Sequence, residues 1–379
     1  MKKILALVLA LVMIVGLVAC TPTPVEPEVN TPTTPTPETP DAPVVPDTIY
    51  IPLVSKGFQH KFWQTVQAGA DAAAADYDVK ISFDGPPSES DISVQVDMLN
   101  AVLAQNPAAL CLAALDTESV SEQLATCVEK GIPIIGFDSG VPNAPAGAIV
   151  STASTDNEAA GALAAQTIMG IADVAAAVTA ATPAAPVVLS VISQDATSAS
   201  ITGRTTGFVN EMFALASAIH DGQVAVTGHD TWSKASTSGD VAVEILVSIA
   251  ASTSVNDCQT AAQAVFQKAP LVIFCTNSGS VDGVLAATAD GSDLDRETGR
   301  YKDILVVGFD SGSTLLNAVE KQWFHGAVTQ DPYMIGYYAV ELAVKVLNGE
   351  TVDEIVDTGC RYYTYQNMND ADIAALLYE

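Results

Sequence analysis

The sequence predicts an α/β protein built from two doubly wound, Rossmann-like lobes. From residue 48 onward, short apolar runs of strand length alternate with helical patterns, and strands separated by single helices pair in parallel. The alternation restarts after Asp156 and Asn157, which indicates a second set of the same kind. The pentapeptide GFDSG occurs once in each set, so the two halves share a local motif.

The first set is expected to contain four strands with helices between them. A helix over residues 61–75 follows the first strand, and Asp91 can cap the next helix. A third helix, with Val120, Leu124 and Val128 as its apolar residues, is expected to end at Gly131. The expected strands are residues 49–54, 79–83, 110–115 and 132–137.

The second set repeats this cycle. Helices are expected around Ile168, around Phe208 and over residues 257–267. Residues 173–186 and 220–240 do not fit the cycle and are interpreted as insertions or surface excursions. The expected strands are residues 187–192, 243–249, 271–275 and 304–309.

The amino end has the layout of a secretory signal peptide. Lys2 and Lys3 supply a positive start, and the apolar stretch over residues 4–18 is too short for an ordinary membrane span. The ending LVAC resembles the bacterial lipobox, in which the cysteine becomes the lipidated first residue. We expect residues 1–20 to be a lipoprotein signal peptide with lipid attachment at Cys20; the alternative is an uncleaved anchor.

Residues 21–47 have a different composition from the rest of the chain. They hold nine of its 20 prolines, many threonines and no lysine or arginine. Such a segment favours an extended, polyproline-like chain, which at about 3.1 Å per residue would span on the order of 80 Å. We expect a tether that holds a folded domain away from a membrane, so the protein is expected at the cell membrane, lipid-anchored and facing the extracytoplasmic side.

The charge balance excludes one class of partner. With 15 Lys and Arg against 44 Asp and Glu, the formal net charge is −29. Nucleic-acid binding draws its affinity from clustered cations, so no nucleic-acid partner is expected.

Metal and nucleophile motifs are not found in the sequence. The four histidines show no paired metal spacing, and neither a GxSxG elbow nor a P-loop occurs. The cysteines beyond Cys20 have no ligand spacing either, and we expect them to be buried free thiols. We therefore expect no metal and no cofactor. These cysteines are Cys111, Cys127, Cys258, Cys275 and Cys360.

The two GFDSG copies lie 172 residues apart, each at the end of a buried strand. In open α/β sheets, ligands bind outside the carboxyl ends of the strands. Two such edges that face each other would form a cleft carrying Asp138 and Asp310. The alternative is that each aspartate only caps the next helix and each glycine only permits the turn.

Further segments occur in a characteristic order between residues 48 and 379. They are SKGFQHKFWQTVQAGA from Ser55, the two GFDSG turns, GRTTGF from Gly203, FCTN ending at Asn277, TQDPYMIGYYAVELAVKVLNG from Thr329 and VDTGCRYYTYQNM near the carboxyl end. Together they resemble the periplasmic-type sugar-binding proteins of bacterial ABC transporters, in the ribose-binding-like class.

The resemblance implies the type 1 periplasmic binding protein fold, in which two lobes are joined by a three-segment hinge. The first lobe would comprise residues 48–155 plus 331–359. The second would comprise residues 156–330 plus 360–379. Gln330 would lie at the return crossing, where family members use a glutamine to touch the ligand.

The same resemblance implies a function. The protein would capture a small carbohydrate, a monosaccharide or polyol, by lobe closure and deliver it to an ABC permease. It would be a monomer without enzymatic activity. A second interpretation is a ligand-sensing subunit that presents a sugar or autoinducer-type furanone to a signalling receptor. A third is a secreted hydrolase using Asp138 and Asp310 as an acid/base pair.

The resemblance also implies a set of ligand-binding residues. A sugar presents C–H faces and hydroxyl edges, which suit an aromatic plate and planar polar groups. Phe62 and Trp63 would supply the plate, with core packing as the alternative for each. A solvated side chain is the alternative for Lys56 and Arg204. The expected polar contacts are Lys56, Asp138, Arg204, Asn277, Asp310 and Gln330.

Some positions depart from the ribose-binding pattern. Ser139 stands where ribose binders carry an arginine, and Ala113 replaces a polar residue on the third strand, so ribose itself is not expected. His60 is expected to begin a helix rather than to contact the ligand. Trp232, within residues 220–240, could supply an opposite aromatic plate.

Overall fold

A computed structural model describes residues 49–378. The predicted signal peptide over residues 1–20, the lipid attachment at Cys20 and the tether over residues 21–47 lie outside the described residues. These three assignments remain predictions.

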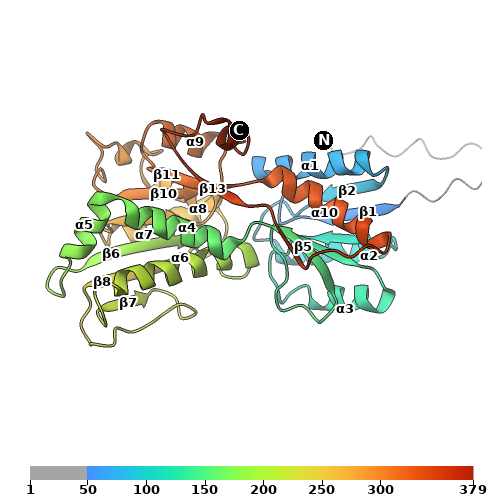
Figure 1. Ribbon diagram of the computed structural model, residues 1–379, viewed down its shortest axis with the longest axis horizontal. Coiled ribbons are helices and arrows are strands. Elements are labelled where there is room, and N and C mark those ends of the chain that lie inside the picture. Colours follow the sequence, from blue (N-terminus) through green and yellow to red (C-terminus); the bar gives the residue numbers. More distant parts are fainter. Residues whose placement is uncertain (1–48, 379) are drawn as a thin grey trace, which may run out of the picture. The chain divides into compact units, whose positions relative to one another are not determined.

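The first sheet has six strands, all parallel, in the order β12-β5-β4-β3-β1-β2. We call this sheet and the helices packed on it the first lobe (Figure 1). Its strands are β1 (Tyr50–Val54), β2 (Lys80–Asp84), β3 (Leu110–Leu112), β4 (Ile134–Phe137), β5 (Ile149–Ser154) and β12 (Ile355–Asp357). Its helices are α1 (Lys61–Asp76), α2 (Ile92–Leu103), α3 (Ser121–Lys130) and α10 (Pro332–Leu347).

The second sheet has seven strands in the order β13-β11-β10-β9-β6-β8-β7, parallel except for the antiparallel pair of β13 with β11. We call it, with its helices, the second lobe. Its strands are β6 (Val187–Ser193), β7 (Val224–Thr227), β8 (Val243–Ile249), β9 (Val272–Cys275), β10 (Leu305–Phe309), β11 (Gly326–Gln330) and β13 (Cys360–Thr364). Its helices are α4 (Asn157–Gly170), α5 (Ala172–Ala180), α6 (Ala199–Ser217), α7 (Val255–Phe266), α8 (Ser278–Ala287), the 3₁₀ helix η1 (Ser292–Leu294), α9 (Ser313–Glu320) and α11 (Ala371–Ala374).

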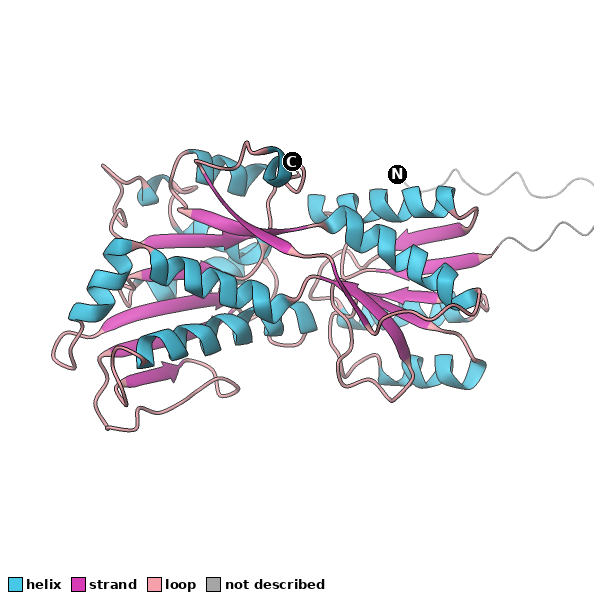
Figure 2. Cartoon of the chain, viewed as in Figure 1, coloured by secondary structure: helices cyan, strands magenta, loops and turns pink. Residues whose placement is uncertain are grey.

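Both faces of each sheet are covered by helices (Figure 2), which confirms the doubly wound prediction. In the first lobe, Ile51 and Leu53 face the core under α1 and α10, whereas Val54 and Leu110 belong to the core under α2 and α3. Because side chains alternate across a strand, apolar runs that are buried on both faces produce two cores. The second lobe likewise has two hydrophobic cores.

Within residues 49–378 the chain passes between the two sheets three times. It crosses from β5 into α4, from β11 into α10, and from β12 into β13. Strands β12 and β5 are neighbours at one edge of the first sheet, and β13 and β11 are neighbours at one edge of the second. All three crossings therefore leave from edge pairs of strands.

Glycines allow two helix pairs to pack at very short range. A Cβ on Gly336 of α10 would overlap the carbonyl oxygen of Val66 in α1. In the second lobe, a Cβ on Gly207 of α6 would overlap the carbonyl oxygen of Glu158 in α4. In each pair, one helix, α10 or α4, follows a crossing between the lobes. The other helix, α1 or α6, carries predicted ligand-binding residues in its first turns. Larger residues at these two glycines would force the helices apart.

The interpretation of residues 220–240 as a surface excursion is wrong in part. Val224–Thr227 form β7, the edge strand of the second sheet, and Trp232 is buried in the core of that lobe with its indole nitrogen donating to Thr206 Oγ1 at 2.9 Å. Trp232 therefore does not line the cleft. Most of residues 173–186 likewise belong to α5 and the short bridge that follows it.

Two smaller expectations also fail. Val128 is 51% exposed, so it does not lie on the buried face of α3; Leu124 lies there as expected, together with Cys127. Asp91 precedes α2, but its side chain makes no capping hydrogen bond. Gly131 does end α3, in the left-handed conformation with φ 66°.

The five described cysteines are all free thiols, as expected, and four of them are buried while Cys360 is half-buried. In the described part of the chain no single helix has the length and apolar character needed to cross a membrane. Helices α4 and α5 meet those criteria only as a pair, and the pair is bent by 80°.

Candidate functional site

A cavity lies between the carboxyl ends of the strands of the two lobes. All eight residues predicted to bind ligand line it. So do residues that the sequence did not single out as contacts, including His60, which was expected only to begin a helix. The lining residues are Lys56, His60, Phe62, Trp63, Glu89, Asp138, Gln194, Ile201, Arg204, Asn277, Ser278, Gly279, Asp310 and Gln330.

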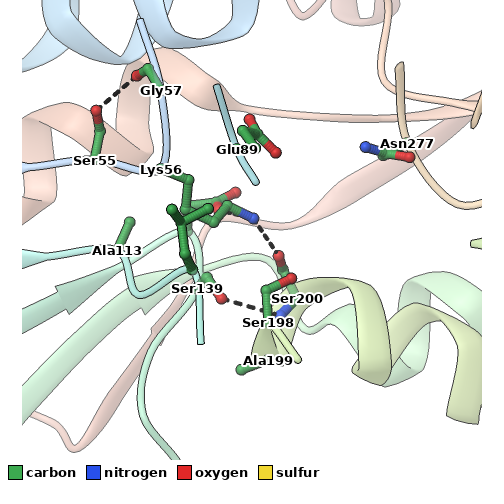
Figure 3. Close-up of polar contacts among 12 residues, drawn as sticks. Ser55, Lys56, Gly57, Glu89, Ala113, Ser139, Ser198, Ala199, Ser200 and Asn277 are labelled. Carbon is green, nitrogen blue, oxygen red and sulfur yellow. Dashed lines mark hydrogen bonds and ion pairs between the residues drawn. The ribbon is translucent and has the colours of Figure 1, made fainter. Parts of the chain in front are cut away.

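Lys56 and Asp138 form a buried ion pair on the first-lobe side. Lys56 follows β1 and Asp138 follows β4, and the Lys56 Nζ lies 3.1 Å from Asp138 Oδ2. Among the described residues, no donor reaches Asp138 Oδ2 in hydrogen-bond geometry. Lys56 also crosses to the second lobe, where its Nζ donates to Ser200 Oγ at 2.9 Å (Figure 3). Lys56 is 5% exposed and is therefore not a solvated lysine.

Burial and charge act in opposite directions on this pair. Burial alone would lower the pKa of Lys56, but the carboxylates of Asp138 and Glu89 outweigh it, so the pKa lies above its usual value. Burial raises the pKa of the Asp138 carboxyl, and the nearby Lys56 cation offsets only part of that rise. A hydrogen-bond donor from a ligand would favour the ionised form of Asp138.

Phe62 and Trp63 open α1 and have a double role in the packing. They are 7% and 2% exposed, belong to a first-lobe core and also border the cavity. Their rings meet edge to face with centroids 4.9 Å apart. The core alternative and the cavity-wall prediction therefore both describe these residues, and their contact with a ligand remains a prediction.

Asp310 is fixed within the second lobe on both carboxylate oxygens. Its Oδ1 accepts from Gln330 Nε2 at 2.7 Å. Its Oδ2 accepts from the Ser278 amide at 3.0 Å and from the Ser278 hydroxyl at 3.1 Å. Ser278 begins α8, whereas Gly312 is the N-cap of α9, so Asp310 does not cap the helix that follows it in sequence.

Arg204 is 2% exposed, which contradicts the surface alternative. Its Nε donates to Asn157 Oδ1 at 2.9 Å and its Nη1 donates to the Thr276 carbonyl at 3.0 Å. The guanidinium lies 3.8 Å from the ring centroid of Phe309, and Nη1 lies 4.0 Å from Asp310 Oδ1. Arg204 is thus held rigidly beside the cavity.

Asn277 is the N-cap of α8, and its side-chain amide contacts Gln194 of the same lobe. Its Oδ1 accepts from the Ser280 amide in a capping box, and its Nδ2 donates to Gln194 Oε1 at 2.7 Å. Gln194 Nε2 in turn donates across the cleft to Glu89 Oε2 at 2.8 Å.

Other direct hydrogen bonds join the lobes around the cavity. The Ser200 amide donates to Ser139 Oγ at 3.3 Å, as Figure 3 shows. The hydroxyl oxygens of Ser90 and Thr253 lie 2.7 Å apart and share a hydrogen bond. The lobes are therefore in contact around the site.

The sequence missed Glu89 and Gln194 because both lie in polar loops that look solvated. Glu89 is in the Ser- and Pro-rich loop after β2, and Gln194 directly follows β6. Each does lie near the carboxyl end of a parallel strand, and that position is the signal that could have identified them. Within residues 49–378, no group of three His, Cys, Asp or Glu side chains could hold a metal ion.

Comparisons with known proteins agree with this geometry. The family model of the periplasmic binding protein domain matches residues 51–351. The D-allose-binding periplasmic protein of Escherichia coli K12 is 24% identical over 298 residues, which cover 77% of this chain and 82% of that protein.

Solved structures give the same result. An ABC transporter protein of Brachyspira murdochii, described as a LacI family transcriptional regulator, is 37% identical with a TM-score of 0.72, covering 88% of this chain and 99% of that one. A carbohydrate transporter solute-binding protein of Agrobacterium radiobacter, in complex with D-arabinose, is 27% identical with a TM-score of 0.66, covering 87% and 99%. The chain described here belongs to the periplasmic binding protein domain family.

Proposed function

We propose that this protein is an extracytoplasmic receptor that captures a small, neutral carbohydrate between its lobes and delivers it to an ABC transporter permease. The observation that carries the proposal is the Asp138 carboxylate, which is buried in the cavity and whose Oδ2 has the Lys56 ammonium 3.1 Å away as an ion-pair partner but no directed hydrogen bond from the described residues. The ion pair offsets part of the cost of burying this acceptor, and a donor from a ligand would complete its hydrogen bonding. A sugar hydroxyl is a suitable donor.

The charges of the cavity favour a neutral ligand. Lys56 and Arg204 contribute two positive charges, against the three carboxylates of Glu89, Asp138 and Asp310. A sugar acid or sugar phosphate would add negative charge to a site that already has an excess of it. The aromatic edges of Phe62 and Trp63 would pack on the C–H surface of a neutral sugar.

The relatives support the same ligand class. The curated relative is named for D-allose, and one solved relative contains D-arabinose. Both sugars are neutral monosaccharides. We therefore place a monosaccharide or polyol first among the candidates and do not assign one sugar.

We propose that the lobes comprise residues 48–155 plus 331–359 and residues 156–330 plus 360–379, and that they rotate about the three crossings. Gln330 ends β11 immediately before one crossing and donates to Asp310 in the cavity. A hinge of this kind can absorb backbone rotation while both lobes stay rigid.

We also propose that Cys20 carries a lipid and that residues 21–47 tether the folded part to the outer face of the cell membrane. The basis is the sequence pattern alone. Mass spectrometry of the protein from membranes would detect an acylated cysteine at position 20, whereas an unmodified, soluble chain would contradict the anchor.

Calorimetric titration of the purified protein tests the carbohydrate assignment. The panel contains D-allose, D-arabinose, other neutral monosaccharides and polyols, with D-glucuronate and D-glucose 6-phosphate as charged counterparts. We expect saturable 1:1 binding of a neutral sugar and at least about tenfold weaker binding of the charged ones. If no neutral sugar binds, the carbohydrate assignment is wrong, and turnover of an oligosaccharide would instead support a hydrolase.

A further inference from the structure

A chain of hydrogen bonds crosses the cleft from Trp63 to Asn277. Trp63 Nε1 donates to Glu89 Oε1 at 2.9 Å, and Gln194 Nε2 donates to Glu89 Oε2 at 2.8 Å. Asn277 Nδ2 donates to Gln194 Oε1 at 2.7 Å. We call these four residues the relay. Its two ends belong to different lobes, and both were predicted to contact the ligand.

The direction of the relay is fixed at its second-lobe end. The Ser280 backbone amide donates to Asn277 Oδ1, so the Asn277 amide group must point its Nδ2 toward Gln194. Gln194 must then present Oε1 to Asn277 and its Nε2 to the first lobe. A backbone amide at a helix start cannot change its role, so this orientation is set by the fold.

The direction is also fixed at the first-lobe end. The indole nitrogen of Trp63 is a donor only, so it too needs an acceptor at position 89. Two donors from opposite lobes thus converge on Glu89, one on each carboxylate oxygen. A carboxylate satisfies both donors, whereas an amide of the same shape satisfies one and opposes the other.

The surroundings keep Glu89 ionised and leave room for Gln194. Burial alone would raise the pKa of Glu89, but Lys56 and the hydrogen bonds from Trp63 and Gln194 outweigh it and hold the pKa below its usual value. On the other side, a Cβ on Gly279 would overlap Gln194 Oε1, so glycine at that position permits the approach.

We propose that Glu89 is a positioning residue: its carboxylate joins Trp63 and Gln194 only when the lobes are closed, and so holds the closed cavity over its ligand. The inference rests on the proposed carbohydrate-binding function. It adds that the rate of ligand release depends on an acceptor at position 89. Glu89 acts through Trp63 and Asn277 and was not among the predicted contacts.

Exchange of the two side chains tests the proposal. In Glu89→Gln, one of the two converging donors faces an amide NH₂ group. In Gln194→Glu, two carboxylates face each other. In the double variant E89Q/Q194E, the new glutamine accepts from Trp63 and donates to the new glutamate, which still accepts from Asn277. All three hydrogen bonds and the net charge are then restored.

The measurements are the dissociation constants and release rates for D-allose and D-arabinose, by calorimetry and stopped-flow tryptophan fluorescence. Each single variant should weaken binding on the order of 10- to 100-fold, mainly through faster release. The double variant should recover most of that loss. Glu118→Gln, which removes an exposed carboxylate from a first-lobe loop at the cleft, is the matched control and should bind like wild type.

A double-mutant cycle on the free energy of unfolding, measured without sugar, provides a readout that does not depend on the ligand. Coupling between positions 89 and 194 supports the relay even if neither sugar binds the wild-type protein, in which case the carbohydrate assignment alone fails. If the double variant is no better than the sum of the single variants in both binding and unfolding, the relay is wrong.

Discussion

The two GFDSG loops have the same sequence and the same place at the end of a buried strand, yet their aspartates are used differently. Both aspartates have left-handed backbones, with φ 54° at Asp138 and 78° at Asp310. Asp310 accepts protein hydrogen bonds on both carboxylate oxygens. Asp138 has Lys56 beside it and, among the described residues, no directed hydrogen bond to Oδ2. Identical local sequence therefore sets the backbone, whereas the neighbours set the role of the side chain.

The serines of the two loops differ in the same way. Ser311 Oγ accepts from the Tyr378 amide at 3.0 Å, and the Tyr378 carbonyl accepts from the Gly312 amide at 2.9 Å, so the carboxyl end of the chain holds the second loop. Ser139 of the first loop instead accepts from the Ser200 amide of the other lobe. The second loop is therefore held by its own lobe, whereas the first loop contacts the second lobe across the cleft.

The largest effect on stability is expected at Asp310. In Asp310→Ala, the Gln330 amide and both Ser278 donors lose their buried acceptor, so the free energy of unfolding should fall by about 3 kcal/mol. Urea unfolding without sugar measures this. Asp372→Ala, at an exposed carboxylate, is the control. An unfolding midpoint equal to that of wild type would show that the second loop does not depend on its aspartate.

Asp138 should show the opposite profile. In Asp138→Asn the free energy of unfolding should fall by about 1–2 kcal/mol, less than in Asp310→Ala, because the buried Lys56 loses its ion pair but the amide oxygen of the new side chain can still accept from it. Binding of D-allose or D-arabinose should weaken about 100-fold, since a charged acceptor is removed from the cavity. Calorimetry and urea unfolding on the same samples separate the two effects. Unaltered binding would remove the distinction between the loops.

A smaller effect is expected at the carboxyl end. The Tyr378 hydroxyl accepts from the Ser311 amide at 3.3 Å, so Tyr378→Phe should lower the free energy of unfolding by about 1 kcal/mol. Tyr365→Phe, on an exposed tyrosine, provides the comparison. If both substitutions have the same effect, Tyr378 does not secure the second loop through its hydroxyl.

The smallest effect is a dependence of stability on pH that comes from the first loop. The pKa of Asp138 lies above its ordinary 3.8 because burial outweighs Lys56, so the native state holds this proton more tightly than the unfolded state. Wild type should therefore gain stability relative to Asp138→Asn as the pH falls through the raised pKa, and the difference should level off below 3.8. Lys56 remains protonated throughout, because its pKa lies above 10.5. Urea unfolding over this range measures the difference, and a loss of relative stability on acidification would contradict it.

Much of the fold could be predicted because it depends on local pattern. Alternating apolar runs and helical faces located strands such as β1, β8 and β10 to within one or two residues. The edge strand β7 could not be found in this way, because its four residues lie within a polar segment and only its pairing with β8 defines it. For the same reason, the prediction that Trp232 could line the cleft was wrong, because it packs in the core beside this segment.

The candidate site was predictable where a residue type follows a strand end within a recognisable motif, as for Asp138 and Asp310. The positions of Glu89 and Gln194 after strand ends could have placed each of them near the site, but their mutual contact could not be predicted, because 105 residues separate them and neither spacing nor composition reveals a contact across two lobes. Arg204 was expected beside the ligand, but sequence could not show that Asn157 and Thr276 already bind two of its nitrogens.

The edge position of the three crossings has a mechanical consequence. In the proposed rotation of the lobes, β5, β11, β12 and β13 lie beside the hinge, whereas β2 and β8 lie at or next to the opposite edges of their sheets. For a given angle of rotation, atoms farther from the hinge move a longer distance. Ser90 and Thr253, which follow β2 and β8, would therefore separate by more than groups beside Gln330, and a solute would enter along that outer margin.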